Sequence, residues 1–364
     1  MKLLFLSKRR PMGRDLARNP YGRFFHLPRI LGERGHRVSI ALLDYENGDK
    51  LKFDAHGIRW TSSPLFGYVG SVEQQIADLA PDWVIGFSDT YFGIFAERIA
   101  RKHGLLSCID AYDNYESYMS WARPLHWLWR RALRRSDLLT AAGPDLLALM
   151  SQGVEDRHSA VVPMAADPIG FTPRDRLKCR EALQLSVSAP LVGYCGSMHS
   201  SRGVDVLFDA IPLVLEERPE VQFVHSGRTW SNVPLPDSIR SLGFIDDDKV
   251  PLLLNSMDVL VVTNRASAFG HYSYPVKLYE AMSCQVPVVA TRTRATEWIL
   301  HRHPDSLVEP GDPQALGAAI LRALAVADAD YQTVSTWQTN CDIFEQALSS
   351  AGGTVQAAAG ASTP

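Results

Sequence analysis

Short apolar runs and longer amphipathic stretches follow one another along almost the whole chain. An unbroken apolar run is typical of a parallel strand covered on both faces, and apolar residues three or four apart are typical of a helix. Their alternation predicts an α/β fold with parallel sheets. One series of strands is expected at residues 3–7, 38–43, 83–88, 106–110, 138–142 and 160–163, and a second at 192–195, 222–225, 259–263 and 286–290.

Glycine and proline mark several boundaries in this pattern. Helices are expected at residues 24–34 and 91–102, which are followed by Gly35 and Gly104. A proline-punctuated stretch at 161–176 separates the two series of strands. It predicts a hinge between domains at 1–168 and 169–330, and 364 residues suffice for two domains. The small, polar residues 351–364 are expected to be disordered.

Composition excludes several classes of protein. A hydrophobic content of 46% and a net charge of −3 are ordinary globular values that give no reason to expect nucleic acid as a partner. Five scattered cysteines favour buried thiols over disulfides or a zinc site, and thus a cytoplasmic location. The first ten residues indicate a strand rather than a signal peptide, and no apolar run approaches the roughly 20 residues that cross a bilayer.

The segment YPVKLYEAMSCQVPVVAT, at 274–291, carries the strongest functional signal. Pro275 suits the first turn of a helix, and Pro287 ends the helical pattern before a buried strand. Because the start of a helix presents free N–H groups and a positive dipole end, this geometry suits a diphosphate.

This segment resembles the donor-nucleotide signature of GT-B glycosyltransferases, in particular the retaining family 4. The match runs through Pro275, Lys277, Glu280 and the following AMSC and PVVA; Gln285 stands where glycine is usual, and Tyr272 where many members have a first glutamate. The resemblance implies two Rossmann-like domains facing across a cleft (GT-B). It also implies a last helix at 331–350 that crosses back onto the N-terminal domain, and domain closure about the linker.

A second signature supports the first. The sequence YCGSMHSSRGVDVL, from Tyr194, resembles the family's glycine turn and following helix through Gly196, Arg202 and Gly203. The resemblance implies that Arg202 neutralises the departing diphosphate in place of the usual lysine, while Ser197 replaces an arginine. An ordinary turn with a solvated arginine is the alternative.

The resemblance also implies residues for the rest of the donor site. Glu280 would hold the ribose hydroxyls, unless it is merely a solvated helix residue, and Lys277 would either approach the diphosphate or cover the helix surface. The loop after residue 263 precedes the helix, where α/β crevices form at the carboxyl ends of strands. Its candidates for the donor pocket are Phe269, Gly270, Ser273 and Tyr274, together with Asn264, Arg265 and His271.

In the first domain, the long basic loop KRRPMGRDLARNPYGRFFHL corresponds to the family's flexible glycine loop. Gly22 best matches its glycine, and Arg14, Arg18 and Arg23 could meet phosphate, although an exposed basic loop explains them equally well. Three catalytic candidates follow strands, namely Asp89, Tyr112 and Asp113, with Tyr112 where histidine is common. A tyrosine with a pKa of about 10 is a poor general base, but it can orient an acceptor hydroxyl.

Two further segments have competing explanations. Asp246, Asp247 and Asp248 fit a helix cap better than a metal site, and no metal is expected. The aromatic and basic segment from Trp121 to Arg135 fits either a helix in a membrane interface or a helix packed on the first sheet with solvated arginines.

The expected function is transfer of a sugar from a UDP- or GDP-linked donor to a hydroxyl of a lipid-linked or cell-envelope glycan, with retention and without a metal or other cofactor. Such an enzyme would be cytoplasmic, at the inner face of the plasma membrane if residues 121–135 bind lipid. A degenerate member that binds nucleotide sugar or an assembly partner without catalysis is the alternative, based on Ser197, Tyr272 and Tyr112. A nicotinamide-dependent dehydrogenase would need a G-x-G-x-x-G loop after the first strand, which the sequence lacks.

Overall fold

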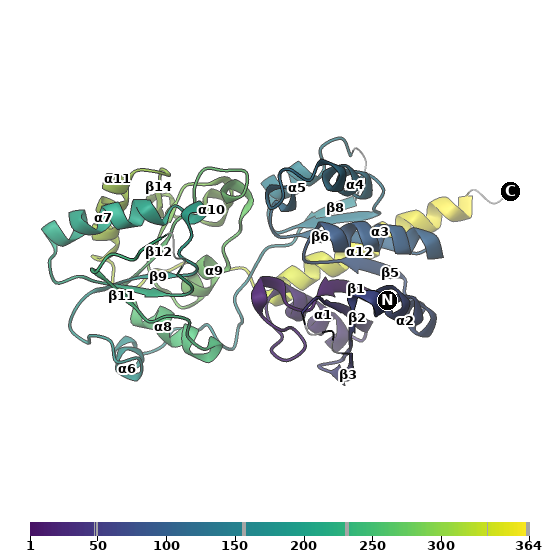
Figure 1. Ribbon diagram of the computed structural model, residues 1–364, viewed down its shortest axis with the longest axis horizontal. Helices are drawn as coiled ribbons and strands as arrows, with labels where there is room; N and C mark the ends of the chain where they lie inside the picture. Colours follow the sequence, from purple (N-terminus) through teal and green to yellow (C-terminus); the bar gives the residue numbers. More distant parts are fainter. Residues whose placement is uncertain (47, 49, 155–157, 230–232, 333, 362–364) are drawn as a thin grey trace. The chain divides into compact units, whose positions relative to one another are not determined.

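The protein, described from a computed structural model, is a mixed α/β chain (Figure 1). The structure describes residues 1–46, 48, 50–154, 158–229, 233–332 and 334–361. The chain forms two compact units, one made of Met1–Met164 with Trp337–Pro364 and the other of Ala165–Thr336. The division falls at residues 164 and 165, four positions before the expected boundary and inside the expected hinge segment.

The first unit is built on an eight-stranded sheet with the order β3-β4-β2-β1-β5-β6-β7-β8. All neighbours pair in parallel except β3 and β4, which form an antiparallel hairpin. The strands are β1 (Lys2–Lys8), β2 (Arg37–Asp44), β3 (Leu51–Ala55), β4 (Ile58–Pro64), β5 (Trp83–Gly86), β6 (Leu106–Ala111), β7 (Leu138–Ala141) and β8 (His158–Val161). The sequence therefore predicted six of these strands, and missed the hairpin.

Helices cover both faces of this sheet. The alternation of β1 shows how, because Leu4 and Leu6 pack with α2 and α3, whereas the Phe5 ring lies 6.4 Å from that of Phe344 in α12. The helices of this unit are α1 (Arg23–Glu33), α2 (Leu65–Leu79), α3 (Thr90–His103), α4 (Arg123–Leu133), α5 (Pro144–Met150) and α12 (Trp337–Ala361).

The C-terminal helix differs from the prediction at both ends. It begins at Trp337 rather than 331 and continues to Ala361, so residues 351–361 are helical and not disordered. Ala351 is fully buried, and the α-carbon side of Gly352 faces Leu106 and Trp83 of the sheet, which explains why the helix persists. The helix packs on α1 within the first unit (Figure 1). Residues 362–364 lie outside the described residues.

The second unit has a six-stranded, fully parallel sheet with the order β11-β10-β9-β12-β13-β14. Its strands are β9 (Leu191–Cys195), β10 (Gln222–Ser226), β11 (Ile239–Ser241), β12 (Val259–Val262), β13 (Val288–Thr291) and β14 (Leu307–Val308). Its helices are α6 (Arg176–Ala182), α7 (Val204–Glu217), α8 (Val250–Ser256), α9 (Val276–Ser283), α10 (Arg294–Ile299) and α11 (Pro313–Ala323).

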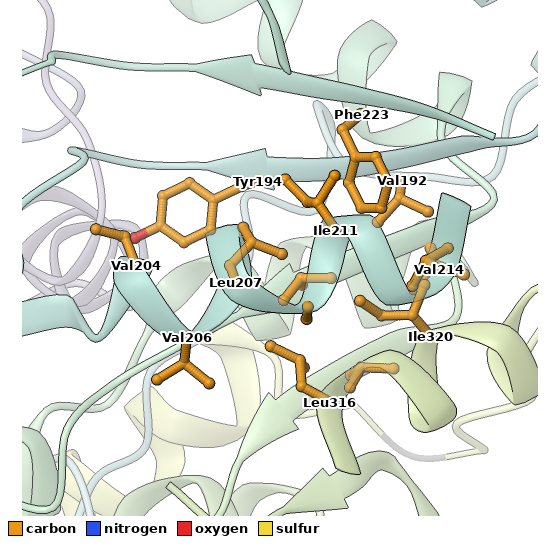
Figure 2. Close-up of a cluster of buried hydrophobic side chains, with 14 of the residues drawn as sticks. Val192, Tyr194, Val204, Val206, Leu207, Ile211, Val214, Phe223, Leu316 and Ile320 are labelled. Carbon is orange, nitrogen blue, oxygen red and sulfur yellow. The ribbon is translucent and has the colours of Figure 1, made fainter. Parts of the chain in front are cut away.

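Two hydrophobic cores sandwich the second sheet. On one face, Val192, Tyr194 and Phe223 pack against Leu207 and Ile211 of α7 and against α11, as Figure 2 shows. On the other face, Leu191 and Val224 pack with α8 and α9. Successive strand residues thus enter opposite cores, which is why the strands read as continuous apolar runs.

Candidate active site

The strand order of the second unit reverses direction between β9 and β12. The chain leaves β9 towards β10 on one side, whereas β12 leads to β13 on the other, and ligands of open α/β sheets bind at such a reversal. The segments that follow these two strands contain Gly196 to Gly203 and Asn264 to Tyr274. Most donor-site residues predicted from the sequence lie in these two segments.

Arg202 closes a short 3-10 helix, Ser200–Arg202, and Gly203 then adopts a left-handed φ of 66° that starts α7. The Nη1 atom of Arg202 lies 3.4 Å from Asn264 Oδ1 and 3.3 Å from Ser273 Oγ. Among the described residues, no hydrogen bond is formed by its Nε or Nη2. Arg202 therefore keeps unused cationic donors beside the β12 loop, as binding of a phosphate requires.

The loop after β12 supports Arg202 in two ways. The Phe269 ring lies under its guanidinium, with the carbon 4.7 Å from the ring centroid. Gly270 allows the loop to fold tightly, because a Cβ there would lie 1.9 Å from the Arg265 carbonyl oxygen. Ser273 accepts the Arg202 bond described above. Tyr274, by contrast, is buried and packs edge-on against Trp298, so it supports the loop rather than lining an open surface.

Glu280 is a buried carboxylate in α9, not a solvated helix residue, since only 9% of it is exposed. Lys277, one turn earlier, donates a hydrogen bond to Glu280 Oε2. The lysine thus pairs with the carboxylate, a contact that neither of the two roles expected for it includes. Both lie near the end of β9, where burial raises the pKa of the Cys195 thiol to about 12.

The position of the family's first glutamate is occupied by an aromatic and cationic pair. The hydroxyl of Tyr272 accepts a hydrogen bond of 3.2 Å from Arg294 Nη1, and the Arg294 guanidinium carbon lies 5.7 Å from the ring centroid. No carboxylate chemistry is available from Tyr272.

Gly196 and Ser197 form the turn after β9. Gly196 has a φ of 155°, and its N–H donates to the Ser226 carbonyl at 2.9 Å. Ser197 is exposed and its carbonyl accepts from the His199 N–H at 3.0 Å. The turn is therefore tied to the neighbouring strand while its tip faces solvent.

In the first unit, Gly22 directly precedes α1 with φ 59° and ψ −153°, a conformation that only glycine adopts readily. Part of the charge of the basic loop before it is paired, because the fully buried Arg9 binds Asp15 of the loop and Asp44 at the end of β2, each at 2.8 Å. Arg10 also binds Asp44.

The expectation that Arg23 could bind phosphate is wrong. Arg23 is fully buried, and its guanidinium binds both oxygens of Asp110 at 2.7 and 2.6 Å. Its Nη1 donates to the Val162 carbonyl at 2.6 Å. Arg23 is therefore a structural residue. Arg14 lies over the Tyr21 ring at 3.8 Å, and Arg18 is mostly exposed.

Asp89 lies at the carboxyl end of β5 and caps α3, where its Oδ1 accepts the Tyr91 N–H at 2.9 Å. Burial raises the pKa of this carboxyl, although Lys8, 3.7 Å away at the end of β1, acts in the opposite direction. The preceding residue, Ser88, has a φ of 78°. Such a left-handed, non-glycine residue stores backbone strain, which is typical of functional sites.

Tyr112 and Asp113 differ in accessibility. Tyr112 is 8% exposed and lies between Phe24 and Tyr115, with ring centroids 5.5 Å away in both cases. Burial raises its pKa well above the ordinary value, and its ring packs among aromatic side chains. Asp113 is less buried and accepts a hydrogen bond of 2.6 Å from the Tyr118 hydroxyl.

The acidic run does not form the expected side-chain cap. Asp247–Lys249 is a 3-10 helix, and the cap residue of α8 is Lys249 without a side-chain hydrogen bond. Asp246 instead binds Lys249 Nζ at 2.9 Å. Among the described residues, no three His, Cys, Asp or Glu side chains are grouped closely enough to hold a metal ion.

Helix α4 packs on the first unit through Trp129, Ala132 and Leu133. Trp121, just before the helix, is 80% exposed, and Trp127 is 58% exposed with Arg131 5.6 Å from its ring. No helix in the described ranges combines the length and apolarity needed to span a membrane.

Comparison with known proteins agrees with this architecture. Residues 23–165 match the model described as "Glycosyl transferase 4-like domain", and residues 189–326 match "Glycosyl transferases group 1". The sucrose-phosphate synthase of Thermosynechococcus elongatus aligns over 95% of this chain and 97% of its own, with a TM-score of 0.76 and 16% identity. Anabaena HepE in complex with UDP-glucose aligns over 96% of this chain and 100% of its own, with a TM-score of 0.74 and 17% identity.

A curated relative extends the match in sequence. The amylovoran biosynthesis glycosyltransferase AmsK of Erwinia amylovora is 23% identical over 276 residues, which are 73% of this chain and 61% of AmsK. The first four curated relatives are matched over only 26% to 61% of their own lengths. The two domain models cover both units, and the solved structures share the two-sheet fold. The chain therefore belongs to the GT-B glycosyltransferases of group 1, family 4.

Proposed function

We propose that the protein transfers a sugar from a nucleoside diphosphate donor to a hydroxyl of a lipid-linked or cell-envelope glycan, with retention of anomeric configuration. The observation that carries this proposal is Arg202, whose Nε and Nη2 form no hydrogen bond with a described residue. HepE, a protein of the same fold, binds UDP-glucose, which supports a nucleotide-sugar donor. AmsK, named for amylovoran biosynthesis, supports a polysaccharide acceptor.

Each donor contact has a distinct physical role. Glu280, oriented by Lys277, accepts hydrogen bonds from the ribose hydroxyls, a task suited to a buried carboxylate. Arg202 stabilises the negative charge that develops on the diphosphate as the glycosidic bond breaks. Because this cation is supplied by the chain, the proposed reaction requires no metal ion. The departing diphosphate oxygen then takes the proton of the acceptor hydroxyl on the same face of the sugar.

The first unit supplies the acceptor site in this proposal. Asp89 is its best candidate contact, because it combines partial burial, a raised pKa and strained neighbouring backbone at the end of a strand. Asp113 is a second carboxylate after the next strand of the sheet, β6. Tyr112 is left out of the proposed catalytic groups, because its ring is packed among aromatic side chains.

A thermal-shift screen with UDP, GDP and their sugars tests the donor assignment. We expect one nucleotide to stabilise the wild type and to stabilise Glu280→Ala much less. Glu97→Ala is a matched control, because Glu97 is also a buried helix carboxylate paired with a residue on its own helix, Arg101, but lies in the first unit. A wild-type protein that no nucleotide stabilises would contradict the assignment.

Membrane association through the segment from Trp121 to Arg135 is the second part of the proposal, at the cytoplasmic face of the plasma membrane. Exposed tryptophans beside Arg123, Arg131, Arg134 and Arg135 suit anionic headgroups. The wild type should sediment with anionic vesicles and not with neutral ones. Trp121→Ser with Trp127→Ser should reduce this binding, whereas Phe244→Ser, which removes a 70% exposed aromatic of the second unit, should not.

A catalytically inactive nucleotide-sugar binder is the alternative, supported by Ser197, Tyr272 and the burial of Tyr112. Measuring the release of nucleoside diphosphate from a panel of donors incubated with acceptor extracts distinguishes the active transferase from the inactive binder. Binding of a donor without turnover in any extract favours the inactive binder.

A further inference from the structure

A fully buried histidine of β10 contacts the turn that follows β9. His225 is paired with Tyr194 in the sheet, and its Nε2 lies 3.0 Å from the Gly196 carbonyl oxygen. Burial lowers the pKa of His225, so the imidazole is neutral, and the proton must be on Nε2 to donate to a carbonyl. The other ring nitrogen lies 3.5 Å from Ser241 Oγ.

The same turn is held to the end of β10 and the segment after it at three further points. The Gly196 N–H donates to the Ser226 carbonyl, and the Met198 N–H donates to the Arg228 carbonyl, both at 2.9 Å. Gly227 lies so close that a Cβ there would be 2.1 Å from the Gly196 oxygen. The peptide between Gly196 and Ser197 therefore has little freedom to rotate.

The orientation of this peptide determines where the next N–H points. No peptide bond of the described chain is cis, and in a trans peptide the C=O and the following N–H point in opposite directions. Because the Gly196 oxygen points towards the buried His225, the Ser197 N–H points away from it, on the exposed side of the turn. Among the described residues, no acceptor bonds to this N–H.

We propose that His225 is a positioning residue that holds the Gly196 peptide so that the Ser197 N–H donates a hydrogen bond to a phosphate of the donor. The inference rests on the proposed nucleotide-sugar site, in which Arg202 lies five residues further along the same turn. The ligand chemistry is that of a diphosphate anion, which a preorganised backbone N–H stabilises without any reorganisation cost. It also explains how the turn can contact phosphate although Ser197 has replaced the usual arginine.

Calorimetric titration of UDP and uridine separates this role from a general loss of structure; GDP and guanosine are used instead if the wild type binds those. A hydrogen bond to a charged group is worth about 10- to 100-fold in affinity. We expect His225→Ala to lower the affinity for UDP by at least about 10-fold and the affinity for uridine by less than about 2-fold. His225→Gln, which can still donate to the Gly196 oxygen, should recover most of the UDP affinity.

One control variant keeps the outcomes distinct. His26→Ala removes another buried histidine, in the first unit, and should leave both affinities unchanged. If His225→Ala weakens UDP and uridine equally, or neither, the inference is overturned while the proposed function stands. If the wild type binds neither UDP nor GDP, the proposed function itself fails.

Discussion

The guanidinium carbon of Arg202 lies 4.7 Å from the centroid of the Phe269 ring, so that an arginine before α7 is held by an aromatic residue of the loop after β12. The contact joins the two segments that follow β9 and β12, where the strand order of the second sheet reverses. Stacking on an aromatic face is a property of the planar guanidinium that lysine reproduces poorly. It accounts for an arginine in the position where the family usually has lysine.

Replacing Arg202 should affect the diphosphate and not the nucleoside. Because a charge-assisted hydrogen bond is lost, we expect Arg202→Ala to lower the affinity for UDP by about 10- to 100-fold. Arg202→Lys should lower the affinity for UDP by an intermediate factor. Calorimetry with UDP and uridine measures both effects. Arg218→Ala, which removes an exposed arginine after the other end of α7, is the control. Equal UDP affinity of Arg202→Ala and Arg218→Ala would contradict this role.

Replacing Glu280 should not discriminate between the diphosphate and the nucleoside. Because the proposed partners of Glu280 are ribose hydroxyls, Glu280→Gln should lower the affinities for UDP and uridine to the same extent, by about 10-fold or more. Glu97→Gln serves as the control for removal of a buried, paired carboxylate. A variant that loses UDP but binds uridine as the wild type does would instead place Glu280 near the phosphates.

Much of the fold was predictable because its strands are buried on both faces. The end of α3 was also predictable from the sequence, because Gly104 is its C-cap with a left-handed φ of 65°. The hairpin of β3 and β4 was missed because β3 is at the sheet edge and half exposed, without a continuous apolar run. The helical tail was missed because its composition gives no sign that Ala351 meets the sheet.

One sequence motif singled out both Lys277 and Glu280, which lie together in α9, but the hydrogen bond between them was not predicted. Contacts between residues far apart in the sequence could not be predicted from local sequence patterns. Arg23 was assigned to the same basic loop as Arg18, yet its acid, Asp110, is 87 positions away. His225 was read only as part of a strand, because the contact that matters is with a turn 29 positions earlier.

The buried pair of Arg23 and Asp110 should be among the most sensitive positions for stability. Arg23→Met leaves Asp110 buried without its cation, and we expect a loss of about 3–5 kcal/mol in the free energy of unfolding. Arg29→Ala, which breaks an exposed pair with Glu33 on the same helix, should cost less than about 1 kcal/mol. Urea denaturation followed by circular dichroism measures both. If Arg23→Met is as stable as Arg29→Ala, the ion pair does not support the fold.

Gln285 offers a stabilising substitution. It follows α9 with a left-handed φ of 59°, where the family pattern has glycine. The strain of such a conformation costs a non-glycine residue about 1–2 kcal/mol, and glycine's greater freedom in the unfolded chain offsets part of the relief. We therefore expect Gln285→Gly to raise the free energy of unfolding by about 0.5–1 kcal/mol. Gln285→Ala loses the same side chain but keeps the strain, so a gain of equal size there would contradict this explanation.

The attachment of α12 to the first unit should depend on pH through Glu345. Hydrogen bonds from His36 and Arg34 lower the pKa of Glu345 from its ordinary value of 4.5. A carboxyl whose pKa is lower in the folded state stabilises the fold above its unfolded pKa, and this contribution disappears as the pH falls through the folded pKa. Between about pH 5 and pH 3, the melting temperature of the wild type should therefore fall more steeply than that of Glu345→Gln. Glu33→Gln, an exposed carboxylate of α1, is the control, and a Glu345→Gln curve that runs parallel to the wild type would show that this contact does not anchor the helix.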